Sequence, residues 1–426
     1  MAVISPEEFR CRTAIAVARP LLPSADALLP YLRRIDQTRI YGNMGPLTRE
    51  LEERLARHFS VPSGSVATVA NATLGLTLAL QALGSRAGSL CLMPAWTFAA
   101  SGHAAVAAGL RPYFLDVDAD DWCIKPDSVM AAIGRLGADQ VGAVMPVAPF
   151  GGRVDTAAWD VFYEQTRIPV VIDAAAAFDS VQPGQVPAVV SLHATKVLGS
   201  GEGGFVISRD RQIVIDVQRR SNFGFYGARE ARVPAMNAKM SEYSAAVGLA
   251  SLDCWPETRA QWAATVMTYR KALAASPEIT VMPGLNGVVS STFVVQVAAS
   301  LGSVGSMAMD LARLGIATRR WWGSGLHEEH AFIGCGRDPL PVTTVLGRQT
   351  IGLPCSRDMA RRDIVNVCTG IATVLHLHPP ATVVLAPQRG SLGRDALRAE
   401  SGAIGGDAGG AAIIYGKEPV SELIPA

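Results

Sequence analysis

The chain has 426 residues, 49% of them hydrophobic and 18% charged, which is enough apolar material for a large buried core. Its length exceeds what one hydrophobic core usually supports, so we expect more than one domain. Thirty-eight basic against 37 acidic residues leave a net charge of +1, which argues against nucleic-acid or anionic-membrane partners. No apolar run is long enough to predict a membrane-spanning helix.

The seven cysteines are scattered, odd in number and form no CxxC pair. This pattern argues against a disulfide framework or a zinc site and favours a reducing compartment, so we expect a cytoplasmic protein. The N-terminal segment carries acidic residues early and lacks the layout of a signal peptide. His327 and His330 have helical spacing but no third ligand, so we expect no metal site.

Apolar residues recur every four positions over 47–59, which predicts an amphipathic helix. Short apolar strands then alternate with helical segments. The strands are expected at 66–70, 89–94, 111–118, 141–152, 169–174 and 205–208. Such alternation predicts an α/β fold in which a mostly parallel sheet is sandwiched by helices.

A long helical run over 244–271 crosses Pro256 and is expected to link two domains. Weaker strands and helices follow, with strands expected at 292–299 and 317–323. We therefore predict a large domain and a smaller C-terminal α/β domain, followed by a flexible tail rich in Gly and Ala. The predicted ranges are 1–255 for the large domain, 256–380 for the small domain and 381–426 for the tail.

Lys196 is one of five lysines against 33 arginines, and it lies between an apolar strand and the Gly-rich turn at 199–204. A loop lysine is usually solvent-exposed. Here the apolar, Gly-rich neighbours favour a buried amine, whose lowered pKa would make it a nucleophile. Ligands of parallel sheets bind beyond the carboxyl ends of the strands, so this position is suited to chemistry.

Asp173 ends a run of apolar residues, where a lone charge is costly unless it is paired. By itself it is explained equally well as a cap at a strand end. A buried aspartate upstream of a Gly-flanked lysine, however, is typical of pyridoxal phosphate (PLP) enzymes. The Asp173 carboxylate would keep the pyridine nitrogen protonated, and Lys196 would hold the aldehyde as an imine.

A PLP site also needs a phosphate site, and residues 71–73 open a helix directly after a strand. Free backbone N–H groups and the helix dipole favour a phosphate there, with Thr73 and Ser191 as hydroxyl donors. Simple helix capping explains Asn71 and Thr73 equally well. Phe98 would lie against the ring face, although core packing is the alternative interpretation.

Many blocks, in order and spacing, resemble the DegT/DnrJ/EryC1/StrS family of PLP-dependent sugar aminotransferases over about residues 12–375. The blocks are YGNMGPLTRELEERLARHF, ANATLGLTLALQALG, LMPAWTFAASGHAAV, PYFLDVDADDWCIKP, IPVVIDAAAAFD, SLHATKVLGSGEGGFVISRD, SNFGFYG, NAKMSEYSAAVGLASL and LPVTTVLGRQTIGLPCS. The resemblance implies the aspartate-aminotransferase-like PLP fold type I.

The resemblance implies that Lys196 forms the imine and that Asp173 faces the pyridine nitrogen. It also implies cofactor contacts to the phosphate and the ring, from Ala72, Thr73, Ser191 and Phe98. Asn222 falls where the family has an Asn that reaches the phosphate of the neighbouring subunit, which implies a homodimer with composite active sites. Substrate contacts fall at Asn43, Lys239 and His327.

The sequence also departs from the family pattern. Ala176 stands where members usually have Gln or His near the phenol oxygen of the cofactor, Phe178 replaces a following His, and Lys239 replaces an Arg. The first hypothesis is an aminotransferase that moves an amino group from glutamate to a keto sugar, nucleotide-linked. The alternatives are a PLP-fold protein with lost or altered catalysis, in a binding or regulatory role, and an aminotransferase for a cyclitol or another cyclic ketone.

Overall fold

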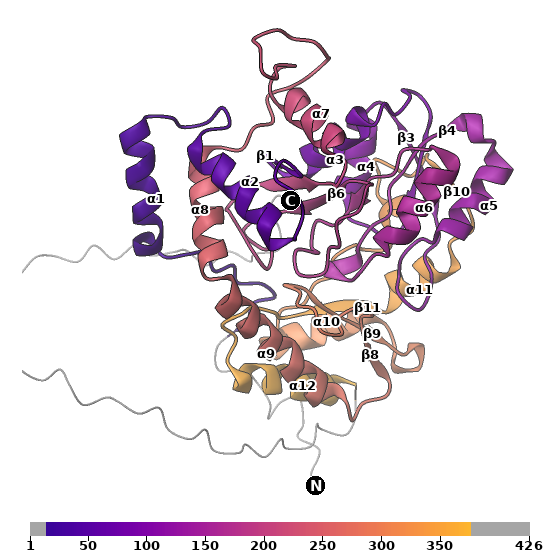
Figure 1. Cartoon of the computed structure of the whole chain (residues 1–426). Helices are drawn as coiled ribbons and strands as arrows, with labels where there is room; N and C mark the ends of the chain where they lie inside the picture. Colours follow the sequence, from indigo (N-terminus) through magenta and orange to yellow (C-terminus); the bar gives the residue numbers. More distant parts are fainter. Residues whose placement is uncertain (1–13, 376–426) are drawn as a thin grey trace, which may run out of the picture. The chain divides into compact units, whose positions relative to one another are not determined.

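A computed structural model of the chain describes residues 14–375, which belong to one compact unit (Figure 1). The predicted tail at 381–426 lies outside the described residues. The division into a large and a small domain at residue 255 stays a prediction. Among the helices of the described part, none is long and apolar enough to cross a membrane.

Two four-stranded sheets form the centre of the unit. The first has the order β1-β7-β6-β5, and its strands are Val66–Val69, Gly204–Ile207, Ala188–Ser191 and Ile172–Asp173. The second has the order β10-β3-β2-β4, with strands Gly336–Arg337, Arg111–Leu115, Leu90–Pro94 and Val141–Val144. Within both sheets, only β7 runs antiparallel to its neighbours.

Isolated parallel bridges, Val144 to Val170 and Val147 to Asp173, join the two sheets along β4 and β5. The mostly parallel sheet predicted from the alternation of strands and helices is therefore confirmed. Every residue of β6 is buried, and successive residues of this strand point into two different apolar clusters. Val189 belongs to one cluster, and Ala188 and Val190 belong to the other. Both faces of the sheet are covered, as parallel strands require.

Helices lie along both faces of the sheets (Figure 1). Their bounds are α2 Pro46–His58, α3 Ala72–Ala82, α4 Ala99–Ala107, α5 Pro126–Leu136, α6 Thr156–Thr166 and α7 Arg211–Ser221. Helix α3 packs between α4 and α7, and α2 packs against α8 (Glu242–Asp253). The helix predicted over 47–59 is confirmed as α2, one residue displaced at each end.

The helical run predicted over 244–271 is wrong as a single helix. It consists of α8 and α9 (Trp255–Leu273), which are separated at Cys254. Pro256 lies in the first turn of α9, where its missing N–H would have had no helical partner, so proline begins this helix instead of interrupting one. A helix that the sequence analysis did not predict, α1 (Ala25–Thr38), contains Pro30.

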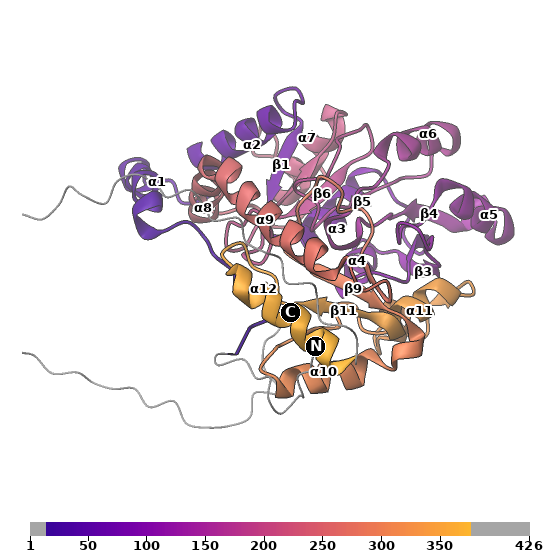
Figure 2. The ribbon, with the colours of Figure 1, turned by 90° about the horizontal axis from the view of Figure 1, so that it is seen from below.

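The C-terminal part contains an antiparallel sheet of order β11-β9-β8, with strands Thr350–Leu353, Phe293–Val297 and Ile279–Val281. Its helices are α10 Val304–Arg313, α11 Pro341–Gln349 and α12 Arg361–Val374, of which α12 lies beside α9 (Figure 2). The strand at 292–299 is confirmed. The strand expected at 317–323 is wrong, since only an isolated bridge joins Arg319 to Gly352.

Candidate active site

The C-terminal ends of β1, β5 and β6 lie on the same side of the first sheet, and this row of strand ends is called the edge below. Gly204, at the start of the antiparallel β7, pairs with Val69 at the end of β1 and with Ser191 at the end of β6. Asp173, at the end of β5, pairs with Val189. The sheet therefore brings the start of α3 to the same edge as Asp173 and Ser191, although α3 begins at Ala72, about 100 residues before Asp173 in the sequence.

Asp173 is the most buried ionisable group at this edge, with 5% of its surface exposed. Its Oδ2 accepts a hydrogen bond of 2.7 Å from the Ser101 hydroxyl, and its Oδ1 accepts one of 3.1 Å from the Ala175 N–H. Burial raises the pKa of this carboxyl, while Ser101, Ala175 and the charge of Lys196 oppose that rise. A buried carboxylate of this kind is stabilised in its charged form by a nearby cation.

Ser101 is itself held in place, since its hydroxyl lies 2.7 Å from that of Thr97, and both residues are buried. Thr97 directly precedes Phe98, the N-cap of α4, and Ser101 lies in the first turn of that helix, so the start of α4 brings the two hydroxyls together. The sequence analysis assigned no role to either residue. The available signal was the spacing of Thr97 and Ser101 directly after a predicted strand.

Lys196 lies in the lysine loop (residues 192–203), which connects β6 to the antiparallel β7. Backbone hydrogen bonds from Leu192 to Gly203 and from Ala194 to Gly201 close this loop. The lysine is half-buried, and burial lowers the pKa of its amine, which the Asp173 charge partly offsets. No ion pair within 4.0 Å joins Lys196 to Asp173 in the described structure, so a group between them would interact with both.

The predicted phosphate position lies at the start of α3. Asn71 is the N-cap, and its side chain accepts a hydrogen bond of 2.9 Å from the Leu74 N–H. The first N–H groups of a helix, here those of Ala72 and Thr73, have no partner within the helix. Gly204 lies so close that a Cβ there would be 2.9 Å from the Ala72 nitrogen. Because a side chain at position 204 would collide with the backbone at Ala72, only glycine fits beside the predicted phosphate site.

Ser191 is 7% exposed, and its hydroxyl accepts a 3.2 Å hydrogen bond from the His193 N–H. Phe98 is the N-cap of α4 and keeps 47% of its surface exposed, which is high for a phenylalanine beside a sheet edge. The core-packing interpretation of Phe98 is therefore wrong. An uncovered ring at this edge leaves a face against which an aromatic cofactor would stack.

His327 lies in a short 3₁₀ helix, Leu326–Glu328, at the end of β2, because the Leu326 N–H donates to the Ala95 carbonyl at 2.7 Å. The imidazole is buried, and burial lowers its pKa although Glu328 lies 3.2 Å away. Within residues 14–375, no three His, Cys, Asp or Glu side chains gather as a metal site would require.

Lys239 is joined to the phosphate edge, because the Ala70 N–H donates a 2.8 Å hydrogen bond to the neighbouring Ala238 carbonyl. Its ammonium lies 4.3 Å from the centre of the Phe223 ring, and burial lowers its pKa. Asn222 pairs through an isolated bridge with Asn237, a second amide that the sequence analysis missed.

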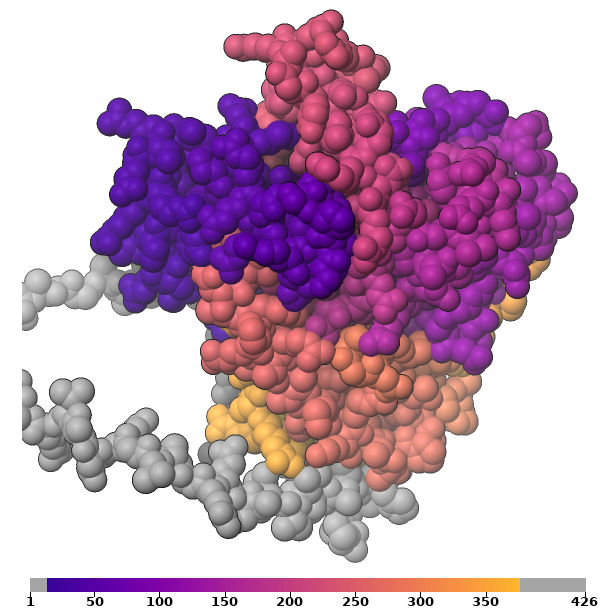
Figure 3. Space-filling model, in the orientation of Figure 1, coloured from indigo at the N-terminus to yellow at the C-terminus, as the bar shows by residue number. Residues whose placement is uncertain are grey.

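Asn222 and Asn237 are the ends of the 222–237 loop, which projects from the surface between α7 and α8 (Figures 1 and 3). Asn43 is exposed, in a left-handed conformation (φ 58°), in the separate loop between α1 and α2. Among the described residues, no hydrogen bond joins either loop to the Asp173 carboxylate, whose partners are Ser101 and Ala175.

The two substituted family positions have different surroundings. Phe178 is 1% exposed and stacks on His58 at 5.1 Å, so it belongs to the core and not to the site. The Ala176 carbonyl closely approaches Gly151, where a Cβ would lie 2.7 Å from it. The side chain of Ala176 offers no polar group toward a ligand.

The residues at this edge fit PLP in three respects. A buried carboxylate calls for a cation, as a protonated pyridine nitrogen is; a nearby lysine amine has a lowered pKa; and a glycine-lined helix start offers free N–H groups. The exposed Phe98 ring adds a stacking surface. These properties correspond to the nitrogen, aldehyde, phosphate and ring of the cofactor.

Comparisons with known proteins show which family the chain belongs to. The model of the DegT/DnrJ/EryC1/StrS aminotransferase family matches residues 25–372. Protein Rv3402c of Mycobacterium tuberculosis is 31% identical over 372 residues, 84% of this chain and 89% of that protein. The dTDP-4-amino-4,6-dideoxy-D-glucose transaminase of Escherichia coli is 27% identical over 366 residues, 83% of this chain and 96% of the enzyme.

Two solved structures have a similar fold. One, from Bacillus cereus ATCC 10987, has a TM-score of 0.78 and 27% identity, and covers 85% of this chain and 100% of its own. The other, DesI in the presence of its TDP-sugar product, has a TM-score of 0.77 and 30% identity, and covers 86% of this chain and 96% of its own. The chain belongs to the DegT/DnrJ/EryC1/StrS family and is a PLP-dependent aminotransferase of fold type I.

Proposed function

We propose that this aminotransferase uses PLP to move an amino group from glutamate to a nucleotide-linked keto sugar. The observation that carries the cofactor assignment is the buried Asp173 carboxylate, fixed by Ser101 and Ala175 and electrostatically coupled to Lys196. The sugar assignment is supported by the transaminase of Escherichia coli, named for a dTDP-linked amino sugar, and by DesI with its TDP-sugar product.

When bound, PLP supplies an electron sink that stabilises negative charge on the carbon next to the amine. Asp173 keeps a positive charge on the pyridine nitrogen, and Ser101 keeps the carboxylate in place. The N–H groups of Ala72 and Thr73, with the Thr73 and Ser191 hydroxyls, hold the phosphate. Phe98 covers one ring face.

Lys196 has two tasks in this proposal. It holds the cofactor through its amine between turnovers, and during turnover the free amine takes the proton from the donor carbon and returns one to the acceptor carbon. A lowered pKa suits both tasks, because an amine must be neutral to act as nucleophile or base.

We further propose a homodimer with composite active sites. This proposal is supported by the 222–237 loop, which projects from the surface with Phe223 and Tyr226 exposed by 49% and 45%. In this arrangement Asn222 reaches the phosphate of the partner subunit, and Asn43, Lys239 and His327 contact substrate. The six cysteines among the described residues are free, which supports the cytoplasm as the compartment.

The first experiment follows the visible absorption of the purified protein with added PLP. The wild type is expected to develop an absorption band that glutamate removes as 2-oxoglutarate forms, and borohydride should trap the cofactor on Lys196. Lys196→Ala should lose the band and the trapping. Lys271→Ala, an exposed lysine on α9, is the matched control and should keep both.

Two alternative functions are distinguished from the proposed one by further experiments on the same purified protein. Ala176 motivates a protein with lost or altered catalysis, which would bind PLP yet leave its band unchanged with every amino donor. A cyclitol or another cyclic ketone is the alternative acceptor. Enzyme loaded with glutamate and screened against sugar nucleotides and inosose ketones identifies the acceptor by return of the band, and turnover with cyclitols alone overturns the sugar assignment.

A further inference from the structure

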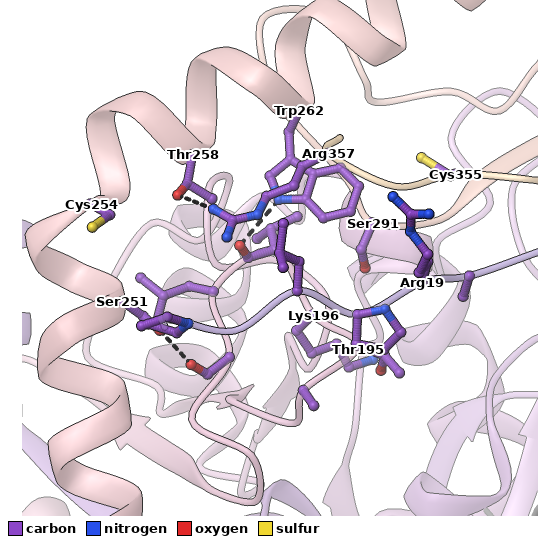
Figure 4. Close-up of a pocket in the computed structure, with 18 residues that line it drawn as sticks. Arg19, Thr195, Lys196, Ser251, Cys254, Thr258, Trp262, Ser291, Cys355 and Arg357 are labelled. Carbon is purple, nitrogen blue, oxygen red and sulfur yellow. Dashed lines mark hydrogen bonds between the residues drawn. The ribbon is translucent and has the colours of Figure 1, made fainter. Parts of the chain in front are cut away.

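We propose that a second cavity, which shares Lys196 with the candidate cofactor site, binds a small oxyanion. This cavity, called the Arg357 cavity here, has a volume of about 60 Å³ and opens to solvent (Figure 4). It lies between the N-terminal segment 18–23, the lysine loop, α9 and residues 355–357. Neither Asp173 nor Phe98 lines it.

The lining of the Arg357 cavity is positively charged. It contains Arg19, Lys196 and Arg357, and no Asp or Glu among its described residues. Arg19 forms an ion pair with Asp358, outside the lining, and Lys196 is assigned to the cofactor. Arg357 has no carboxylate within 4.0 Å among residues 14–375. A partly buried cation without an anion is costly, and a bound anion would offset that cost.

The hydrogen bonds of Arg357 show which atoms an anion would meet. Its Nη1 donates a 2.6 Å hydrogen bond to the hydroxyl of Thr258 on α9, which orients the guanidinium (Figure 4). Its Nε is fully buried, and no acceptor for it exists in the described part of the chain. The edge formed by Nε and Nη2 therefore makes no hydrogen bond among the described residues, and two parallel N–H groups of this kind bind a carboxylate or phosphate oxygen pair well.

An oxyanion on Arg357 would connect segments that are distant in sequence. The N-terminal segment, the lysine loop and α9 all contribute to the lining, and Ser251 on α8 already donates a 2.7 Å hydrogen bond to the Gly199 carbonyl of the lysine loop. A ligand that binds the folded state but not the unfolded state raises the thermal stability of the protein by mass action. An oxyanion is therefore expected to stabilise the loop that carries Lys196.

The test is thermal unfolding of the PLP-loaded enzyme, in which the cofactor already fills its own phosphate site. Sodium phosphate and sodium succinate are titrated in separate experiments. Sodium chloride at the same ionic strength is the control for general charge screening by salt. Phosphate identifies a phosphate site, and succinate, which carries no amine to donate, identifies a carboxylate site. At least one of them should raise the unfolding midpoint in a saturable manner.

Arg357→Gln is expected to weaken the apparent affinity by at least about tenfold, and Arg357→Lys by less, because lysine keeps the charge without the paired N–H groups. Arg313→Gln, an exposed arginine on α10, should leave the shift unchanged. Should Arg357→Gln not fold, Thr258→Val removes the orienting bond and should weaken binding several-fold.

A stabilisation that survives in both Arg357→Gln and Thr258→Val, or no saturable effect of either anion in the wild type, overturns the oxyanion site. The visible band is recorded in the same samples. Loss of that band contradicts the cofactor assignment and leaves the result on the Arg357 cavity to be judged by the unfolding midpoints alone.

Discussion

The Ser101 hydroxyl donates a hydrogen bond of 2.7 Å to Oδ2 of Asp173, 72 residues later in the chain. It fixes one carboxylate oxygen from α4, while the Ala175 N–H fixes the other from the segment after β5. Because hydrogen bonds from both sides favour the ionised carboxyl, they oppose the effect of burial on its pKa. The site thus depends on a serine that touches neither cofactor nor substrate in our proposal.

Ser101→Ala should leave the fold intact and lower kcat by about tenfold, since a hydrogen bond to a charged group contributes roughly 1.5–3 kcal/mol. The expected signature is a shifted pH dependence of the visible band of the bound cofactor. Ser101→Thr keeps the hydroxyl and should restore most of the wild-type profile. Unchanged pH dependence in Ser101→Ala would show that the serine has only a packing role.

Asp173→Asn is expected to abolish activity while it stabilises the protein without cofactor. Burial raises the pKa of Asp173 in the folded state, so the wild type loses stability as pH rises from the unfolded value of 3.8 through the folded pKa. Asparagine carries no charge and escapes this loss. Unfolding in urea at pH 4 and pH 7 should show the variant gaining stability relative to the wild type only at the higher pH.

Composite sites predict a specific result when inactive variants are mixed. Lys196→Ala and Asn222→Ala should each be inactive as pure dimers. If Asn222 acts across the interface, refolding them together creates heterodimers with one intact site, and roughly a quarter of wild-type activity should return. Activity that never returns places Asn222 in its own subunit's site. Asn237→Ala, tested in the same way, shows which of the paired amides is needed.

Glu242 on α8 is expected to be important for stability. It is 1% exposed and accepts hydrogen bonds from the N–H groups of Leu47 and Thr48, both at 2.8 Å, at the start of α2. Glu242→Ala should lower the free energy of unfolding by about 2–4 kcal/mol, because it leaves buried donors without partners. Ser241→Ala removes only the exposed cap of α8 and should cost about 1 kcal/mol or less.

The titration of Glu52 is expected to make the free energy of unfolding depend on pH just below neutrality. Burial raises its pKa to about 7, although Thr68 donates hydrogen bonds from its N–H and its hydroxyl, both at 2.8 Å. Since the folded state holds the proton more tightly than the unfolded state, stability falls as pH rises from about 4.5 to about 7. Glu52→Gln should remove this dependence and gain on the order of 2 kcal/mol above pH 7 in denaturant unfolding. Parallel pH curves for variant and wild type would contradict the assignment.

The sequence predicted the parts of the site that are defined by short segments. Lys196 with its glycine turn, Asp173 at a strand end and residues 71–73 at a helix start are each recognisable within about a dozen residues. The sequence did not indicate Ser101 or Glu242, because their roles depend on partners 72 and about 195 residues away. Such contacts depend on how the sheet brings distant strand ends together.

The two wrong elements have local causes. Apolar periodicity continues across Pro256, so the pattern did not show that α8 ends at Asp253 and that the proline starts a new helix. Residues 317–323 are rich in residues that favour strands, yet strand formation requires a neighbouring edge. Among the described residues, this segment has only scattered partners: the Ala317 N–H donates to the Ile15 carbonyl, and Arg319 pairs with Gly352 through an isolated bridge.

The direction of β7 has a further consequence. Because this strand returns antiparallel beside β6, both ends of the lysine loop are fastened to the same rim of the sheet, Ser191 opposite Gly204. Lys196 is thereby positioned by a loop between two adjacent strands, independent of the lengths of the crossover connections elsewhere. Insertions in those connections could reshape the entrance for a new acceptor without displacing the chemistry.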